Sequence, residues 1–320
     1  MKKGYFAISL DFELLWGLAG WTVEEIKRYQ PRAEGAVGAL RRIVELLSKY
    51  GMKCSIAHVG AMDYHSVEEL LRDSDGIRPS YANPLFSSYE SLLPTIGRDF
   101  PARLFFCPDV LEWLRGCDNV ELCSHTFSHY YCLEAGQSPQ EFETDVRRAT
   151  EDARRKGKPF RTIIFPRNQV SSEYLKICEC YGLTHYRGNF ENFLYRSETT
   201  PSRFDVRRVF RLLDTYVNLS GSNTYVPEMA CGGALRNVPG SRFLRPYMPA
   251  LSWLEPLKVR RIMKSMEHAA HCGEIYHLWW HPHNFGLHTD ENLQQLEQIC
   301  RHFQTLRQRY QMESAFIGEL

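Results

Sequence analysis

Two histidines four residues apart, His125 and His129, stand directly after an apolar stretch that ends at Cys123. On a helical turn this spacing places both imidazoles on one face, about the width of one metal ion apart. A metal site of this kind also needs a third ligand and a group that takes up or releases a proton. The chain offers two pairs of candidates, one near each end, namely Asp11 with Glu13 and His281 with His283.

The spacing of the two histidines is a weak indication by itself, because a chain of 320 residues with 12 histidines contains such pairs by chance. His277 and His281 are a second pair with the same spacing. Whether the candidate side chains lie close together therefore depends on the strands and helices that position them.

Short apolar stretches alternate with amphipathic ones along the chain, which is the pattern of parallel strands joined by helices. We predict strands at 5–10, 54–59, 120–123, 161–165, 183–186 and 274–280. We predict helices at 33–50, 108–115, 139–156, 171–181, 203–219, 255–272 and 289–312. Two irregular segments, 60–107 and 188–250, are predicted to be long insertions over the mouth of a barrel, within a single domain that covers 1–320.

Polar side chains follow four of the predicted strands, at the point where each strand ends. The carboxyl ends of parallel strands lie at one edge of a sheet or barrel, where the active sites of α/β proteins are built. Four polar groups in equivalent places are a stronger indication than any one motif. The four groups are Asp11 and Glu13, His125 and His129, Arg167 and Asn168, and His281 and His283.

Composition excludes some classes of partner. Hydrophobic residues make up 43% and charged residues 24% of the chain, and the net charge of +1 gives no indication of nucleic-acid binding. No apolar stretch approaches the roughly 20 residues of a transmembrane helix. Asp11 and Glu13 interrupt the apolar start, which favours a first strand over a signal peptide. We expect a cytoplasmic protein with mostly buried free thiols among its ten cysteines, and the oligomeric state stays unknown.

The four polar groups, together with their neighbours, resemble the motifs of the polysaccharide deacetylase family, also called the NodB-homology or carbohydrate esterase family 4 type. The motifs are Ser-Leu-Asp-Phe-Glu at 9–13, Ser-His-Thr-Phe-Ser-His at 124–129, Phe-Pro-Arg-Asn-Gln at 165–169 and Trp-His-Pro-His at 280–283. The resemblance spans 4–284, and the histidine motif is its most specific part. The acidic motif departs from the usual adjacent Asp-Asp pair and resembles the divergent Asp-x-Asp branch. The arginine motif lacks the usual aromatic-glycine ending.

The resemblance implies an α/β fold, a distorted (β/α)7 barrel, with a divalent metal, most often Zn²⁺. It implies that His125, His129 and Glu13 bind the metal, a ligand set that leaves one position open. Asp11 is implied as the general base, and Arg167 as the group that orients the base carboxylate. Two alternatives stay open. Asp11 could be the ligand with Glu13 in support, and Arg167 could bind a phosphate or carboxylate of the substrate.

The resemblance also implies His281 as the general acid, because a histidine titrates near neutral pH. His283 is either an alternative acid or a contact to the substrate. Trp280 and Asn168 are predicted to bind the substrate, with the Trp280 ring against the face of a sugar.

We therefore expect a metal-dependent hydrolase that removes an acetyl group from a sugar or glycan in surface-polysaccharide or glycoconjugate biosynthesis. One alternative is hydrolysis of another C–N bond, such as a cyclic amide, on the same scaffold. The other is a catalytically silent carbohydrate-binding protein, which would have no chemical need for Asp11, the two histidines and His281 together. The sequence does not distinguish an N-acetyl from an O-acetyl substrate.

Overall fold

The computed structural model describes residues 2–73, 78–190, 206–226 and 235–320. Within these residues the strands are β1 (Tyr5–Phe12), β2 (Cys54–His58), β3 (Val120–Ser124), β4 (Thr162–Ile164), β5 (His185–Arg187), β6 (Arg236–Asn237), β7 (Arg242–Phe243), β8 (Ile275–Trp280) and β9 (Glu313–Ala315). The helices are α1 (Val23–Glu34), α2 (Ala36–Lys49), α3 (Val67–Arg72), α4 (Ser88–Ser91), α5 (Pro108–Arg115), α6 (Pro139–Arg155), α7 (Ser172–Cys180), α8 (Val206–Tyr216), α9 (Glu255–Cys272) and α10 (Thr289–Tyr310).

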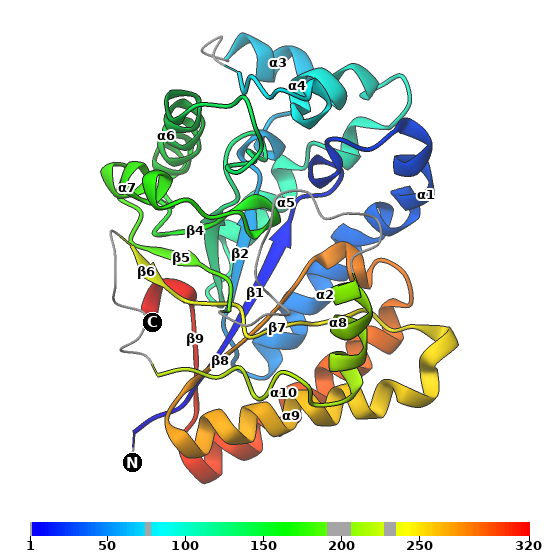
Figure 1. The fold of residues 1–320 in the computed structure, drawn as a ribbon, viewed down its shortest axis with the longest axis vertical. Coiled ribbons are helices and arrows are strands. Elements are labelled where there is room, and N and C mark those ends of the chain that lie inside the picture. Colours follow the sequence, from blue (N-terminus) through cyan, green and yellow to red (C-terminus); the bar gives the residue numbers. More distant parts are fainter. Residues whose placement is uncertain (1, 74–77, 191–205, 227–234) are drawn as a thin grey trace.

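The strands form one curled sheet in the order β6-β5-β4-β3-β2-β1-β8-β7, and β9 pairs with the beginning of β1. Each of these pairings is parallel. β1 lies between β2 and β8, near the middle of the molecule (Figure 1). Because the strands are parallel, their carboxyl ends meet at the edge toward which the β1 arrow points in Figure 1. This is the α/β barrel-like fold that the sequence predicts.

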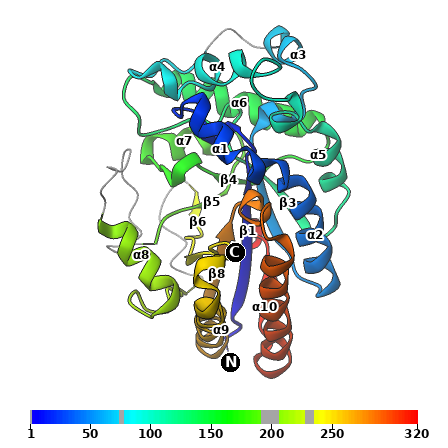
Figure 2. The same cartoon turned by 90° about the vertical axis from the view of Figure 1, so that its right-hand side faces the viewer.

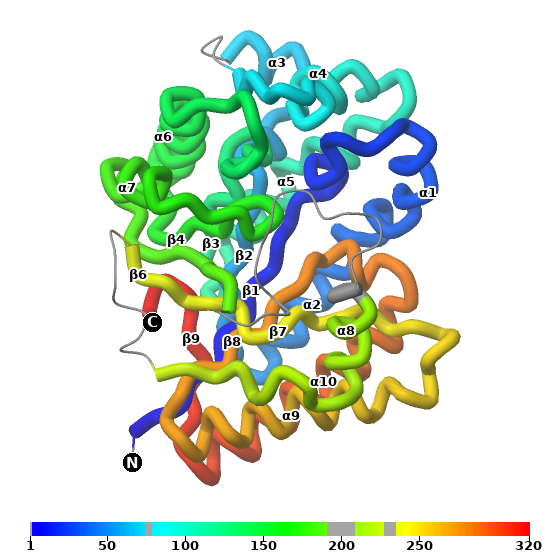
Figure 3. The backbone as a smooth tube through the Cα atoms, viewed as in Figure 1, coloured from blue at the N-terminus to red at the C-terminus, as the bar shows by residue number. Residues whose placement is uncertain are grey.

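One extended segment, 236–244, links the two outer strands of the sheet. Gly240 donates its N–H to the carbonyl of Gly188 just after β5, and Leu244 donates its N–H to Trp279 of β8. Figure 3 shows this yellow segment running from β6 to β7. A Cβ on Gly240 would lie 2.8 Å from the Trp279 ring, so a glycine is needed for this close approach.

Residues at alternate positions of β1 pack in two separate hydrophobic clusters. The inward residue Ala7 packs inside the curled sheet, and residues 315–320 at the C-terminus supply Ala315, Ile317 and Leu320 to the same cluster. Ser9 and Asp11 continue this inner row toward the carboxyl end of the strand. The outward residues, which join the larger cluster with the helices, are Phe6, Ile8, Leu10 and Phe12.

The helices cover the outside of the sheet, with α9 and α10 side by side and α2 against α10 (Figure 2). The predicted helix at 33–50 corresponds to α2, and a further helix, α1, precedes it and meets it at Gly35. A capping box between Thr22 and Glu25 begins α1, and Pro31 lies inside it. The sequence analysis missed α1, as well as the short strands β6, β7 and β9.

The two predicted insertions differ in how far the structure describes them. Segment 60–107 contains α3, α4 and short 3₁₀ turns, and lies at the end of the sheet toward which β1 points (Figure 1). Segment 188–250 contains α8, β6 and β7, but its residues 191–205 and 227–234 lie outside the described part. The single-domain assignment stays a prediction. Among the described helices, none combines the length and the apolar character that a membrane span requires.

Candidate active site

Asp11 and Glu13 lie together at the carboxyl end of β1, and both side chains are buried, with 3% and 8% exposure. The sequence analysis expected both to reach one site because they are two residues apart. His281 lies opposite them, with its Nε2 3.7 Å from Asp11 Oδ2 and 3.5 Å from Glu13 Oε1. The first and last of the four polar groups therefore meet.

Gly17 leaves the space that the Glu13 carboxylate occupies, because a Cβ at position 17 would lie 2.2 Å from Glu13 Oε1. We expect Gly17→Ala to fold but to bind a divalent metal more weakly, by about 10- to 100-fold, as disturbances next to metal ligands typically do. Calorimetric titration with Zn²⁺ measures the effect. Gly38→Ala is the control, because nothing lies within 4 Å of its added Cβ. Equal affinities of the two variants would show that Gly17 does not position Glu13.

His125 and His129 lie in a bent loop and not on the helical turn that their spacing would suit. The His125 N–H still extends β3, by donating to the His58 carbonyl at 2.9 Å. Thr126 and His129 then adopt φ values of 63° and 62°, in the left-handed region that a right-handed helix does not use. The two bends nevertheless bring the imidazole centroids to 5.0 Å from each other. The histidines converge as expected, through a different backbone path.

Asp145 on α6 holds this loop in place. Its carboxylate accepts the backbone N–H of Phe127 at 2.6 Å and that of Ser128 at 3.0 Å, together with the Ser128 hydroxyl. Burial raises the pKa of Asp145 to about 6, against the effect of these hydrogen bonds. The loop between the two histidines thus depends on one buried carboxylate that the sequence analysis did not identify.

We expect Asp145→Ala to lower the free energy of unfolding by about 3 kcal/mol, because two buried backbone N–H groups lose their acceptor at about 1–3 kcal/mol each. It should also weaken metal binding, since the histidine loop loses its support. Glu143→Ala, an exposed position on the same helix, should change stability little. Urea denaturation of both variants tests this, and a similar stability of the two would remove the role assigned to Asp145.

His125, His129 and Glu13 present one ligand atom each within 4.8 Å of one another. His125 Nδ1 lies 2.7 Å from the carbonyl oxygen of Ile164, which can only accept, so Nδ1 bears the proton and Nε2 presents a lone pair. This Nε2 faces Glu13 Oε2 at 3.3 Å, and His129 Nε2 faces the same oxygen at 2.9 Å. A nitrogen lone pair and a carboxylate oxygen repel each other at this distance unless a cation or a proton lies between them.

The protonation of these groups suits a metal. Burial lowers the pKa of His129 to about 4, so its ring is neutral at pH 7. Burial opposes the ionisation of Glu13, but the neighbouring imidazoles of His281, His125 and His129 hold the pKa of Glu13 well below its ordinary value. Imidazole nitrogens and one carboxylate form the ligand set of many catalytic zinc sites. The residues therefore fit a divalent metal.

His281 and His283 follow β8 in a short 3₁₀ turn, Pro282–Phe285, in which the His281 N–H donates to the Asn284 side chain at 3.2 Å. The two imidazoles stack with centroids 4.7 Å apart. Only His281 keeps an exposed part, 21% of its side chain, because His283 is buried against Tyr29. Burial lowers the pKa of His283 to about 3, so at neutral pH its ring is neutral and lacks the acidic proton of an imidazolium.

The arginine that binds Asp11 is Arg187, not Arg167 as predicted. Arg187 lies at the end of β5 and is 1% exposed. Its two terminal nitrogens donate to Asp11 Oδ1 at 2.7 Å and Oδ2 at 2.6 Å, a bidentate ion pair. Burial opposes the ionisation of Asp11, but the Arg187 charge lowers the pKa of Asp11 below its ordinary value. Arg187 also lies over the Trp279 ring, 4.2 Å from its centroid.

Arg167 and Asn168 have other contacts than those predicted. Arg167 pairs with Glu134 at 3.2 Å and lies 3.8 Å from the centroid of the Tyr131 ring, next to the histidine loop. Asn168 accepts hydrogen bonds from Arg187 with its side-chain oxygen, at 2.8 and 3.2 Å. Asn168 therefore supports the arginine that supports Asp11, and its predicted contact with substrate stays a prediction.

Trp280 does not offer a sugar-binding surface, so this prediction is wrong. Its side chain is 0% exposed and stacks on Phe285 with centroids 5.5 Å apart. The alternation of β8 explains the error, because Trp279, the residue before it, points to the inside of the sheet and packs on Arg187.

Three further residues that the sequence analysis did not select lie beneath Asp11. Ser9 accepts a hydrogen bond from Arg187 at 3.1 Å, and its hydroxyl lies 2.8 Å from His277 Nε2. Arg187 directly follows the predicted strand 183–186, so it fits the same rule that selected the other polar groups. Ser9 and His277 lie inside strands and offered no such signal.

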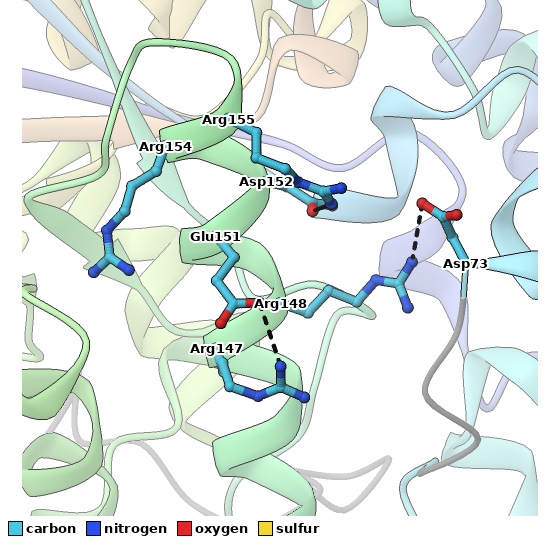
Figure 4. A pocket seen from close by; sticks show the side chains of 7 residues that line it. All are labelled: Asp73, Arg147, Arg148, Glu151, Asp152, Arg154 and Arg155. Atoms are coloured by element: carbon cyan, nitrogen blue, oxygen red, sulfur yellow. Dashed lines mark hydrogen bonds and ion pairs between the residues drawn. The ribbon is translucent and has the colours of Figure 1, made fainter.

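A separate hollow lies between α6 and the end of α3, lined by four arginines and three acidic residues (Figure 4). Arg147 pairs with Glu151 at 3.3 Å and Arg148 with Asp73 at 3.8 Å. Arg155 forms a further ion pair within α6. Because three of the four arginines pair with acidic groups and Arg154 donates to the Tyr181 carbonyl, the hollow gives no indication of an anion-binding site.

The sequence matches no model of a protein family and no curated protein. Solved structures do match. A proposed polysaccharide deacetylase from Mycobacterium smegmatis aligns with 93% of this chain and 84% of its own, at a TM-score of 0.55 and 11% sequence identity. A CE4 family pseudoenzyme from Bacillus anthracis covers 99% of this chain and 65% of its own, with a TM-score of 0.43 and 12% identity. Puue allantoinase covers 94% and 84%, with a TM-score of 0.47 and 10% identity.

The first of these structures establishes the fold, and the other two are too distant to support a conclusion. The chain has the distorted barrel of the polysaccharide deacetylases, as the four motifs predicted. At 11% identity the likeness concerns the fold and not the activity. The reaction must therefore be inferred from the residues of the site.

Proposed function

We propose that this protein is a metal-dependent hydrolase that removes an acetyl group from a sugar of a glycan or glycoconjugate. The observation that supports it most is the convergence of Glu13, His125 and His129 on one point, beside an ion-paired Asp11 and a partly exposed His281. The four motifs and the shared fold support an acetylated sugar as the substrate class. A role in biosynthesis and a place in the cytoplasm remain expectations from the sequence.

His125, His129 and Glu13 would hold the metal, with Zn²⁺ as the first expectation. When bound, a divalent metal supplies Lewis acidity that polarises the acetyl carbonyl and lowers the pKa of water in the site. The Ile164 carbonyl fixes the His125 ring with Nε2 directed at Glu13. This arrangement prepares the ligands before a metal arrives.

Asp11 is the proposed general base. Its bidentate contact with Arg187 fixes the direction of the carboxylate and keeps it ionised, so that it accepts a proton from the attacking water. Asp11 Oδ2 and Glu13 Oε1 both lie within 3.7 Å of His281 Nε2. His281, the exposed member of the histidine pair, then protonates the leaving amine or alkoxide. Water adds to the acetyl carbon, the bond from this carbon to the sugar nitrogen or oxygen breaks, and the products are acetate and the protonated leaving group.

The direct test is a substrate panel on the zinc-loaded full-length protein. The panel contains N-acetylated and O-acetylated sugars and cyclic amides, and free acetate and ring opening are measured separately. We expect acetate from an acetylated sugar, and about 100- to 10,000-fold slower release from the Asp11→Asn variant. Ring opening without acetate release would overturn the proposed reaction, and sugar binding without turnover of any compound would assign the protein to the silent binders.

A further inference from the structure

A second group of metal-ligating side chains lies at the other end of β8 from the candidate active site. It consists of His268, Cys272 and Glu274, and we call it the α9–β8 cluster. Glu274 directly precedes β8, whereas His281 directly follows it, so the six residues of the strand separate the two sites. A strand of this length spans about 20 Å, so the two groups cannot share one ion.

The local sequence explains why these three side chains meet. His268 and Cys272 are four residues apart on the last turns of α9, which places both on one face of the helix. Gly273 ends the helix in a left-handed conformation, with φ 72°, and donates its N–H to the Ala269 carbonyl. The N–H of Glu274 donates to the same carbonyl at 2.9 Å. The chain thus turns back, and the Glu274 carboxylate comes to lie beside the helix face.

The geometry suits a single cation that enters from solvent. One ligand atom from each residue lies within 4.8 Å of the others, and His268 Nε2 is 3.5 Å from Glu274 Oε2. The Thr224 hydroxyl donates to the same oxygen and so orients the carboxylate. His268 and Cys272 are exposed, and Glu274 is partly buried at the base of the cluster.

The geometry points to a second divalent-metal site of the zinc class, formed by His268, Cys272 and Glu274. Sulfur, imidazole nitrogen and carboxylate oxygen together are ligands of Zn²⁺, whereas Mg²⁺ and Ca²⁺ prefer oxygen ligands alone. The thiolate is the binding form, so Cys272 releases its proton to solvent when the metal binds. The bound ion joins the end of α9 to the start of β8. This inference does not rest on the proposed function.

Cobalt(II) distinguishes the two sites, because only the α9–β8 cluster contains a sulfur ligand. We titrate the reduced, full-length protein with Co²⁺ and record absorption in the near ultraviolet, where thiolate-to-cobalt charge transfer appears. The wild-type protein should show this absorption, and Cys272→Ser should not. Cys180→Ser, at the other exposed cysteine of the described residues, should keep it.

The histidine has a matched control as well. His268→Ala should weaken cobalt binding at this site by at least about tenfold, since even changes next to metal ligands cost that much. His271→Ala, an exposed histidine on the same turn of α9, should not. His125→Ala should retain the absorption, because His125 belongs to the candidate active site. The experiment can therefore contradict the second metal site without contradicting the proposed function, and the reverse. No thiolate absorption in the wild type at saturating Co²⁺, or an absorption that survives Cys272→Ser, would overturn the second site.

Discussion

Replacing Arg187 with methionine should destabilise the protein by about 3–5 kcal/mol, because it leaves the buried Asp11 carboxylate without its partner. Arg187 is 1% exposed and donates to both oxygens of Asp11. Chemical denaturation measures the loss of stability. The rate of acetyl hydrolysis should also fall, even at temperatures where the variant stays folded, because the Asp11 carboxylate is no longer held in place.

Two variants separate this effect from a general loss of charge. Arg167→Met removes the arginine that the sequence analysis had placed on Asp11, but its partner is Glu134 and its side chain is 26% exposed. Its effect on stability should be much smaller. Arg187→Met combined with Asp11→Asn removes both buried charges and should recover part of the lost stability. If the two single arginine variants were equally stable, the ion pair between Arg187 and Asp11 would not have the role that we assign to it.

The sequence predicted those parts of the site that follow long apolar strands. Asp11 is the last residue but one of β1, and Glu13 and His281 come directly after β1 and β8, the two longest of the described strands, so strand geometry alone places these side chains at one edge. Because polar groups also follow the other predicted strands, the sequence predicted that these side chains converge with His125.

The parts that could not be predicted depend on contacts between distant segments. Arg187 ends a strand of three residues, and its bond to Asp11 follows from the curl of the sheet, which no local pattern encodes. The histidine loop has left-handed residues at Thr126 and His129, held by Asp145 on the next helix. Trp280 was assigned to the wrong face because a run of apolar residues in a buried strand does not reveal which side faces the site.

Replacing Asp11 with asparagine should lower turnover by about 100- to 10,000-fold, the range of a lost general base, and should leave metal binding in place. The asparagine keeps the shape of the side chain and one acceptor for Arg187.

Replacing Glu13 with glutamine should instead remove most of the bound metal, because Glu13 Oε2 faces both imidazoles at 2.9 and 3.3 Å. Steady-state kinetics and elemental analysis of both variants, with circular dichroism to confirm folding, measure the two effects.

This pair of variants decides between the two carboxylates, which the sequence left open. Their positions favour Glu13 as the ligand, since the contacts of Asp11 are to Arg187 and, at 3.7 Å, to His281. If Asp11→Asn lost the metal and Glu13→Gln kept it, the two roles would be exchanged.

The most direct test of the whole account is the metal content of the purified protein, measured by elemental analysis. It is best done in the Cys272→Ser background, so that the α9–β8 cluster does not contribute. We predict about one divalent metal per chain, as a site with three protein ligands binds a single ion. His129→Ala should lose it, and His288→Ala, at an exposed histidine, should keep it. No metal in the parent protein even after Zn²⁺ is added, or equal metal in the His129 and His288 variants, would contradict a hydrolytic metal centre at this site.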